Sequence, residues 1–189
     1  MPDVAIALAL AWGAGLRAYA VIFAVGLAGA MGWVELPGHL EVLQHPVVIG
    51  ASGFMTLVEF GADKVPWLDS IWDAIHSFVR IPAGAALAAM AFGDSSDAVM
   101  VAAAILGGSL AAAMHAAKAG TRAAINLSPE PFSNWTASLS EDALVPLGLW
   151  LAIAHPLVFF ALLAGCLIAA VFLVRLLWRG VQRLTRPAT

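Results

Sequence analysis

Charged residues are scarce in this 189-residue chain, since Asp, Glu, Lys and Arg together make up only 11% of it. Soluble domains contain about 25%. Hydrophobic residues make up 62%, and the mean hydropathy is +0.92. A soluble domain of this length has too small an interior to bury so much apolar surface. The composition therefore excludes a disordered chain and almost any cytosolic enzyme, and it leaves an integral membrane protein.

Other classes are excluded by what the chain lacks. The formal net charge of −3 is not that of a basic nucleic-acid-binding protein, so no nucleic acid is expected as a partner. Cys166 is the single cysteine, which leaves no pair for an intrachain disulfide or a CxxC site. The sequence shows no HExxH motif, no glycine-rich phosphate loop and no hydrolase triad. No cofactor and no catalytic residue is predicted, and an enzyme is the least favoured class.

The apolar residues fall into six segments, and a spanning helix needs about 20 mostly apolar residues. No segment alternates with a period of two, so strands are not expected. The sequence predicts an all-α polytopic transmembrane helix bundle of about six segments, with at least one segment broken or re-entrant, in a single domain over residues 1–189. The predicted segments are 4–31, 46–63, 66–92, 98–126, 134–154 and 156–178.

The segment 66–92 is half polar and contains Pro82, so three arrangements remain open for it: spanning, re-entering, or lying at the interface. Its charged residues Asp69, Asp73, His76 and Arg80 are spaced by four, three and four, which places them on one face of a helix. That face could lie solvated in the headgroup layer. An internal cavity is favoured instead, because the apolar run 81–92 follows directly.

A second stripe of the same kind lies in segment 98–126, where His115, Lys118, Arg122 and Asn126 are spaced by three, four and four. The alternative for this stripe is a helix end at the cytoplasmic interface with Lys and Arg extended towards the headgroups. We expect the two stripes to face each other, because a charge at the bilayer centre costs about 2.5–3.5 kcal/mol unless it is paired or hydrated.

Other charged residues stand out for the same reason. Arg17 follows a Gly-Ala-Gly break in the first segment and needs a carboxylate partner, for which Glu59, Asp63 and Glu141 are the candidates. Prolines on both sides of Glu130 interrupt any helix there. The candidate pathway residues are Arg17, Glu59, Asp63, Lys64, Asp69, Asp73, His76, Arg80, His115, Lys118, Arg122, Asn126, Glu130, Glu141 and Asp142.

Lys and Arg placement predicts the orientation. Arginines are concentrated near the C-terminus, at 175, 179, 183 and 186, so 179–189 is expected to be a basic cytoplasmic tail. The segments that contain Glu35 and Glu41, and Asp94 and Asp97, have no Lys or Arg and are expected outside. Six spans then place both termini in the cytoplasm. A weak inverted repeat also remains open, because residues 14–18 and 45–48 resemble 119–123 and 155–158.

Long stretches of the chain resemble one family. The strings GLRAY, VEFGADKVPWLDSIWDAIHSFVRIPAGA, HAAKAGTRAAIN and SPEPFSN with SEDA are similar to the bacterial membrane proteins grouped as domain of unknown function 4126. The resemblance covers about residues 11–156. It implies a small multi-pass protein of the bacterial cytoplasmic (inner) membrane, and it implies no settled activity.

Transport is the favoured class of function. Carboxylates and histidines within a membrane can carry protons, and buried Arg and Lys can hold an anion. We expect a small charged solute or a lipid headgroup to move through a polar intramembrane cavity, with the proton as a candidate coupling ion. The alternatives are a divalent-cation transporter with Asp69, Asp73 and His76 as candidate metal ligands, and a non-transporting membrane scaffold or assembly subunit. The lipid bilayer and a second copy of the chain are the other candidate partners.

Overall fold

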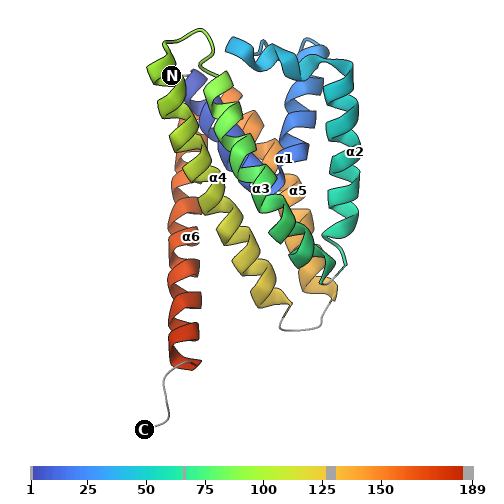
Figure 1. The fold of residues 1–189 in the computed structure, drawn as a ribbon, viewed down its shortest axis with the longest axis vertical. Helices are drawn as coiled ribbons and strands as arrows, with labels where there is room; N and C mark the ends of the chain where they lie inside the picture. Colours follow the sequence, from blue (N-terminus) through green and yellow to red (C-terminus); the bar gives the residue numbers. More distant parts are fainter. Residues whose placement is uncertain (1, 66, 127–130, 185–189) are drawn as a thin grey trace.

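The computed structural model describes residues 2–65, 67–126 and 131–184, and this part of the chain is helical without strands. The elements form an elongated bundle (Figure 1), and the six α-helices match the six predicted ranges to within three residues, except that the last helix ends at 184 instead of 178. They are α1 (Pro2–Ala30), the 3-10 helix η1 (Gly38–Gln44), α2 (Pro46–Ala62), α3 (Leu68–Met90), α4 (Asp97–Ile125), α5 (Pro131–Ala154) and α6 (Pro156–Leu184).

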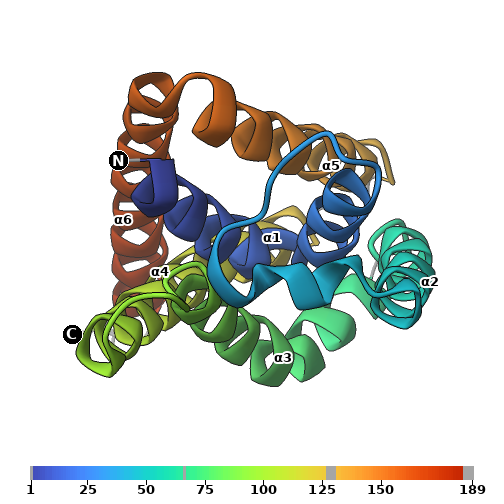
Figure 2. The ribbon, with the colours of Figure 1, turned by 90° about the horizontal axis from the view of Figure 1, so that it is seen from above.

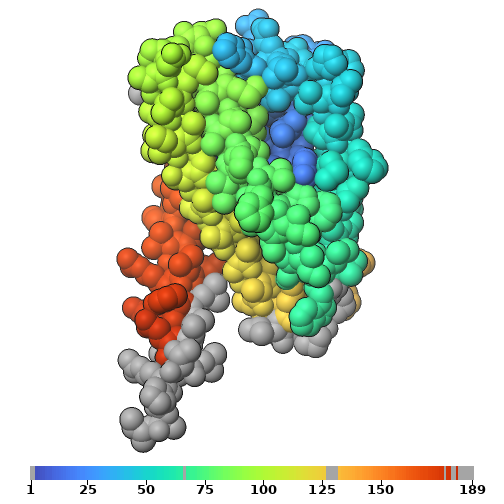
Figure 3. Space-filling model, viewed as in Figure 1, coloured from blue at the N-terminus to red at the C-terminus, as the bar shows by residue number. Residues whose placement is uncertain are grey.

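We call the end of the bundle that contains η1 and the α3–α4 turn the upper end, and the end that contains the α2–α3 turn the lower end (Figure 1). The helices α2 to α6 run between these ends in alternating directions. The last turns of α6 extend past the other helices at the lower end (Figure 3).

The first helix is broken and folds back on itself. Arg17 has φ −149° and ψ 80°, outside the helical region. A Cβ added at Gly13 would lie 2.7 Å from Val21 Cγ2, whereas eight residues of straight helix span about 12 Å. Both halves of α1 therefore extend from the upper end towards an apex at Arg17 inside the bundle (Figures 1 and 2). The broken segment is α1, whereas α3 is one continuous helix through Pro82.

This break changes the expected placement of the termini. The first turn of α1 lies at the upper end, and the last turns of α6 lie at the lower end (Figure 1). The expectation that both termini share one side of the membrane assumed that residues 4–31 cross as a single straight helix. The chain turns back at Arg17, so the first segment does not run from one end of the bundle to the other.

The middle helices have their polar faces inside and their apolar faces outside. In α3 the side chains of Asp73 and Arg80 are 2% and 1% exposed, whereas Ile75 and Phe78 are 60% and 85% exposed. A headgroup-layer helix would have the reverse arrangement. Apolar surface on the outside of a bundle needs lipid around it.

Length and hydropathy agree with this arrangement. In the part of the chain that the structure describes, four stretches are long and apolar enough to cross a membrane: Asp3–Ala30, Asp97–Ile125, Phe132–Ala154 and Pro156–Leu176. The first of these contains the break at Arg17, α2 is shorter, and α3 is more polar. The protein is a helical membrane protein.

Small residues bring α1, α3 and α4 into close contact. A Cβ on Gly107 would overlap Ala88 Cβ, and one on Gly15 would lie 2.5 Å from the Ala111 carbonyl oxygen. Lipid removes the hydrophobic drive between helices, so such close backbone packing supplies the attraction. It also holds the apex of α1 against α4, where the charged residues begin.

The two short sequence echoes occupy partly different structures. His45 and His155 both precede a proline that begins a helix, α2 and α6 respectively. Arg17 lies at a helix break, whereas Arg122 lies inside continuous α4. The local structures therefore match at one echo and differ at the other.

Candidate functional site

A network of ion pairs lies between the apex of α1 and the lower end of the bundle, and it connects α1, the C-terminal end of α2, α3, α4 and α5. We call it the ion-pair network. Its members are Arg17, Glu59, Asp63, Asp73, Arg80, Lys118, Arg122, Glu141 and Asp142. The four basic residues and Glu59, Asp63 and Asp73 are buried.

Arg80 lies between two carboxylates. Its Nη2 donates to Glu59 Oε1 at 2.5 Å, and its Nη1 donates to Asp73 Oδ1 at 2.6 Å. The same Nη1 is 3.2 Å from His115 Nδ1. A guanidinium can only donate, so His115 accepts at Nδ1 and carries its proton on Nε2. That nitrogen is 2.6 Å from Ser77 Oγ, and the Ser77 hydroxyl donates to the Asp73 carbonyl oxygen.

Asp63 is the centre of the second part of the network. It follows the last residue of α2, where the chain turns towards α3, and it is fully buried. Its Oδ2 is 2.9 Å from Arg17 Nη2, 3.2 Å from Lys118 Nζ and 3.8 Å from Arg122 Nη2. Lys118 also lies 3.5 Å from Asp73 Oδ1, which joins this part to Arg80.

The helix α5 supplies the remaining carboxylates. Glu141 Oε2 is 3.2 Å from both Lys118 Nζ and Arg122 Nη2, and Asp142 Oδ1 is 3.0 Å from Arg17 Nε. Arg17 also lies 3.7 Å from Glu141. The sequence predicted one partner for Arg17 from Glu59, Asp63 and Glu141. The structure pairs Arg17 with Asp63, Glu141 and Asp142, and Glu59 pairs with Arg80 instead.

Three hydrogen-bonding residues of the site were not predicted. Arg122 donates to the carbonyl oxygen and to Oδ1 of Asn134, and Arg17 Nη2 donates to Ser138 Oγ at 3.0 Å. Asn134, Ser138 and Glu141 are spaced by four and three, so the rule that identified the other stripes places them on one face. Ser77 follows Asp73 by four and belongs to the α3 stripe in the same way.

The two predicted stripes lie against each other. Asp73 and Arg80 contact Lys118 and His115. Asn126 Nδ2 donates to Asp69 Oδ1 at 3.0 Å and to Ser70 Oγ at 2.9 Å. The contact is direct hydrogen bonding and ion pairing.

His76 and Lys64 form no ion pair with a member of the network. His76 donates from Nδ1 to the Trp72 carbonyl oxygen at 2.8 Å and stacks on that ring, with the centroids 4.0 Å apart. Lys64 lies over the Phe60 ring and donates to the Phe60 carbonyl oxygen. Burial lowers the pKa of Lys64, and Asp142 acts in the opposite direction. Glu130 lies outside the described residues.

The candidate metal ligands do not converge. Asp69 binds Asn126, Asp73 binds Arg80, and His76 Nδ1 donates to the Trp72 carbonyl oxygen. Among the residues that the structure describes, no three His, Cys, Asp or Glu side chains are placed to hold a metal ion. The donor set in these positions does not fit a divalent cation, which needs several oxygen ligands around one point.

The ion-pair network has more carboxylates than cations. Five carboxylates face four basic side chains, and the Asp142 side chain is 25% exposed. Several buried polar atoms of the network have no hydrogen-bond partner, and these include one oxygen each of Glu59, Asp63 and Asp73. The unpaired atoms also include donor nitrogens of Arg17 and Arg122. Each unpaired group in a buried cluster needs an explanation, and a bound proton, ion or water is one.

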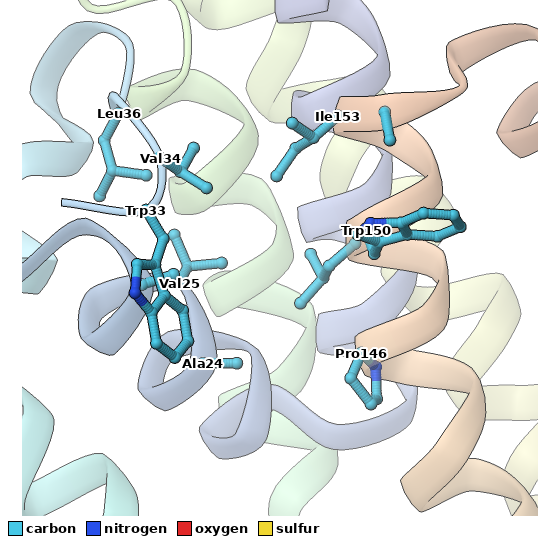
Figure 4. Close-up of a pocket in the computed structure, with 11 residues that line it drawn as sticks. Ala24, Val25, Trp33, Val34, Leu36, Pro146, Trp150 and Ile153 are labelled. Carbon is cyan, nitrogen blue, oxygen red and sulfur yellow. The ribbon is translucent and has the colours of Figure 1, made fainter. Parts of the chain in front are cut away.

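A separate groove lies at the upper end, between the second half of α1, residues 33–36 and α5 (Figure 4). Its volume is about 490 Å³. Side chains of Val25, Trp33, Pro146, Trp150 and Ile153 are among its lining, and none of the lining residues is charged. The groove does not include a member of the ion-pair network.

These features define the class of the protein: a helical membrane bundle in which a broken helix brings an arginine to a buried network of charges. A sequence profile of the family described as "Domain of unknown function (DUF4126)" matches residues 4–176, so the chain belongs to this family. No curated protein and no solved structure matches the chain. The residues of the network lie within the matched range.

Proposed function

We propose that the protein is a small membrane transporter, in which the ion-pair network is the pathway for a small charged solute or a lipid headgroup and protons are the coupling ion. One observation carries this proposal: buried and partly buried carboxylates outnumber the buried cations around the apex of a broken helix. Irregular backbone at membrane depth is typical of transporter binding sites, where it contacts a substrate or ion.

The energetics support a functional role for the charges. Ion pairs removed from water are often less stable than apolar side chains of the same volume, so their presence needs a reason other than stability. A titratable network can change charge as a solute enters and leaves. Direct pairing also means that a solute must exchange with existing partners, which favours a small charged group over an apolar one.

We propose the cytoplasmic membrane of a bacterium as the location, with the lower end in the cytoplasm. Lys64 lies in the α2–α3 turn at the lower end, and α6 extends there with Arg175 and Arg179. The segments at the upper end contain acidic residues and no Lys or Arg. The positive-inside rule then gives this orientation. The first turn of α1 lies on the external side in this arrangement.

A scaffold is the second candidate, and the closed pairing around Asp63 favours it. Three cations contact one buried carboxylate there, an arrangement that can hold α1, α2 and α4 together without any substrate. A scaffold does not require the surplus carboxylates, however, and flux measurements separate the two functions.

Flux across reconstituted vesicles tests the proposal. Proteoliposomes with an internal pH-sensitive dye are given a potassium-diffusion potential, with sodium, potassium or inorganic phosphate as the test solute. We expect proton flux above that of empty vesicles, its loss in Lys118→Met and its retention in Asp97→Asn, a first-turn variant of α4 outside the network. Wild-type flux equal to that of empty vesicles for every solute, with Lys118→Met changing only thermal stability, would establish the scaffold.

A further inference from the structure

The charges of the network divide into two groups when each carboxylate and each cation is assigned to its shortest ion pairs. Arg80 is paired with both Glu59 and Asp73, and we call these three residues the Arg80 triad. The other six members of the network, Arg17, Asp63, Lys118, Arg122, Glu141 and Asp142, comprise three cations and three carboxylates. Two carboxylates and one guanidinium leave the triad with a formal charge of −1. All three side chains are at most 3% exposed.

We infer that the Arg80 triad is a proton-binding site, in which Glu59 and Asp73 together hold one proton at neutral pH. Binding one proton from water converts one carboxylate to a carboxylic acid and brings the formal charge of the triad from −1 to zero. The acid remains hydrogen-bonded to Arg80 through its carbonyl oxygen, and the other carboxylate remains its ion-pair partner.

The unpaired oxygens support this assignment. Glu59 Oε1 and Asp73 Oδ1 accept from Arg80, whereas Glu59 Oε2 and Asp73 Oδ2 are buried without a partner. Each side chain thus has one oxygen engaged and one available for a proton. A buried carboxylate without a counter-charge is costly, and protonation removes the charge without requiring additional space.

Among the neighbouring groups, Lys118 is the cation nearest to the triad, and its ion pair with Asp73 is the longest of its three. His115 accepts from Arg80 at Nδ1, which requires a neutral ring. Lys118 is 3.5 Å from Asp73 but closer to Asp63 and Glu141, each at 3.2 Å. On the α1 side, Tyr19 is a neutral phenol near Glu59 and Arg80.

His76 is the remaining titratable neighbour. It lies on α3 between Asp73 and Arg80 in the sequence, stacked on Trp72 and edge-on to Tyr19. Its Nδ1 donates to the Trp72 carbonyl oxygen, and neither ring nitrogen has a recorded bond to a triad carboxylate. A charged His76 is therefore the competing explanation, and the experiment must distinguish it.

This inference extends the proposed function, because it names the site that binds the coupling proton, but proton binding can be measured without transport. Infrared spectroscopy of the purified full chain in detergent separates carboxylic acids from carboxylates. Labelling Asp and Glu separately with carboxyl-¹³C assigns the band to one residue type. We expect a buried carboxylic acid in the wild type at neutral pH.

Two single variants provide the decisive result. In Glu59→Gln and in Asp73→Asn, one carboxylate remains and forms an ion pair with Arg80. The formal charge of the triad is then zero without a bound proton. We expect the acid band to disappear in both variants, whichever residue holds the proton. The band should persist in Asp142→Asn, which removes a carboxylate that is 25% exposed from the other part of the network.

Thermal unfolding gives an independent readout. Each single variant should unfold within about 2 °C of the wild type, because neither leaves a buried charge without an ion-pair partner. The double variant leaves Arg80 without a carboxylate partner and should unfold about 5 °C lower or more. The inference is wrong if both carboxyl groups are ionised in the wild type or if labelled histidine shows a charged His76. Flux without an acid band would refute the inference alone, and an acid band without flux would refute the proposed transport alone.

Discussion

Removal of the Arg17 guanidinium should destabilise the protein by an amount that the geometry sets. Arg17 is 1% exposed and contacts Asp63 at 2.9 Å and Asp142 at 3.0 Å. Breaking a buried ion pair on one side costs about 3–5 kcal/mol. Asp63 keeps Lys118 and Arg122 in Arg17→Ala, and Asp142 is partly hydrated, so the lower value of about 3 kcal/mol applies.

This free energy corresponds to a fall in the unfolding temperature of about 6–12 °C, since 1 kcal/mol shifts it by about 2–4 °C at this chain length. Size-exclusion chromatography of heated, detergent-solubilised protein measures the shift. Arg179→Ala is the matched control, because Arg179 is exposed near the C-terminal end of α6. An exposed charge of this kind contributes at most about 1 kcal/mol.

Second-site variants test the network against a single-partner explanation. If Arg17 needed only Asp63, the Asp63→Asn change should restore stability to Arg17→Ala. The structure predicts a further loss, because Asp63→Asn also removes a shared partner of Lys118 and Arg122. Recovery in that double variant, or an unfolding temperature for Arg17→Ala equal to that of Arg179→Ala, would refute the reasoning.

Two further predictions concern the fold. Reporter fusions before residue 2 and after residue 189 should report opposite sides of the membrane, because α1 turns back at Arg17, and a shared side would contradict the fold-back. Gly107→Ala should lower the unfolding temperature, because the added Cβ would overlap Ala88 Cβ, whereas a Cβ added at Gly165 in α6 would have nothing within 4 Å. Gly165→Ala should therefore unfold at or above the wild-type temperature, since Ala is favoured over Gly in a helix by about 1 kcal/mol.

The sequence was sufficient to predict the helices and much of the site, because both depend on short-range spacing. Asp73 and Arg80 lie on one face of α3 as a consequence of helical periodicity, and so do His115 and Lys118 on α4. The cost of charge in lipid then predicted correctly that such faces turn inward. Asn134 and Ser138 follow the same rule and could have been found by extending it to uncharged polar residues.

The break at Arg17 and the choice of partners could not be predicted in this way. Gly13 and Gly15 mark a weak point in the helix, but the direction in which the chain turns depends on packing against α4 and α5. Asp63 lies at the end of α2, and its three cations come from α1 and α4. Such pairings depend on distances between helices, which residue spacing within one helix does not contain.

The distribution of charges has a consequence for assembly of the bundle. The four ionisable residues on the α3 stripe would together cost about 10 kcal/mol in lipid if each costs about 2.5, so α3 is unstable in the membrane without its partners. The α3 stripe obtains those partners from α2 and α4 through Glu59, Lys118 and Asn126. These helices must therefore associate as one cooperative unit. The described part of α6 contacts α1, α4 and α5 but contributes no residue to the network, so its association depends on apolar packing such as that of Phe159 on Trp12.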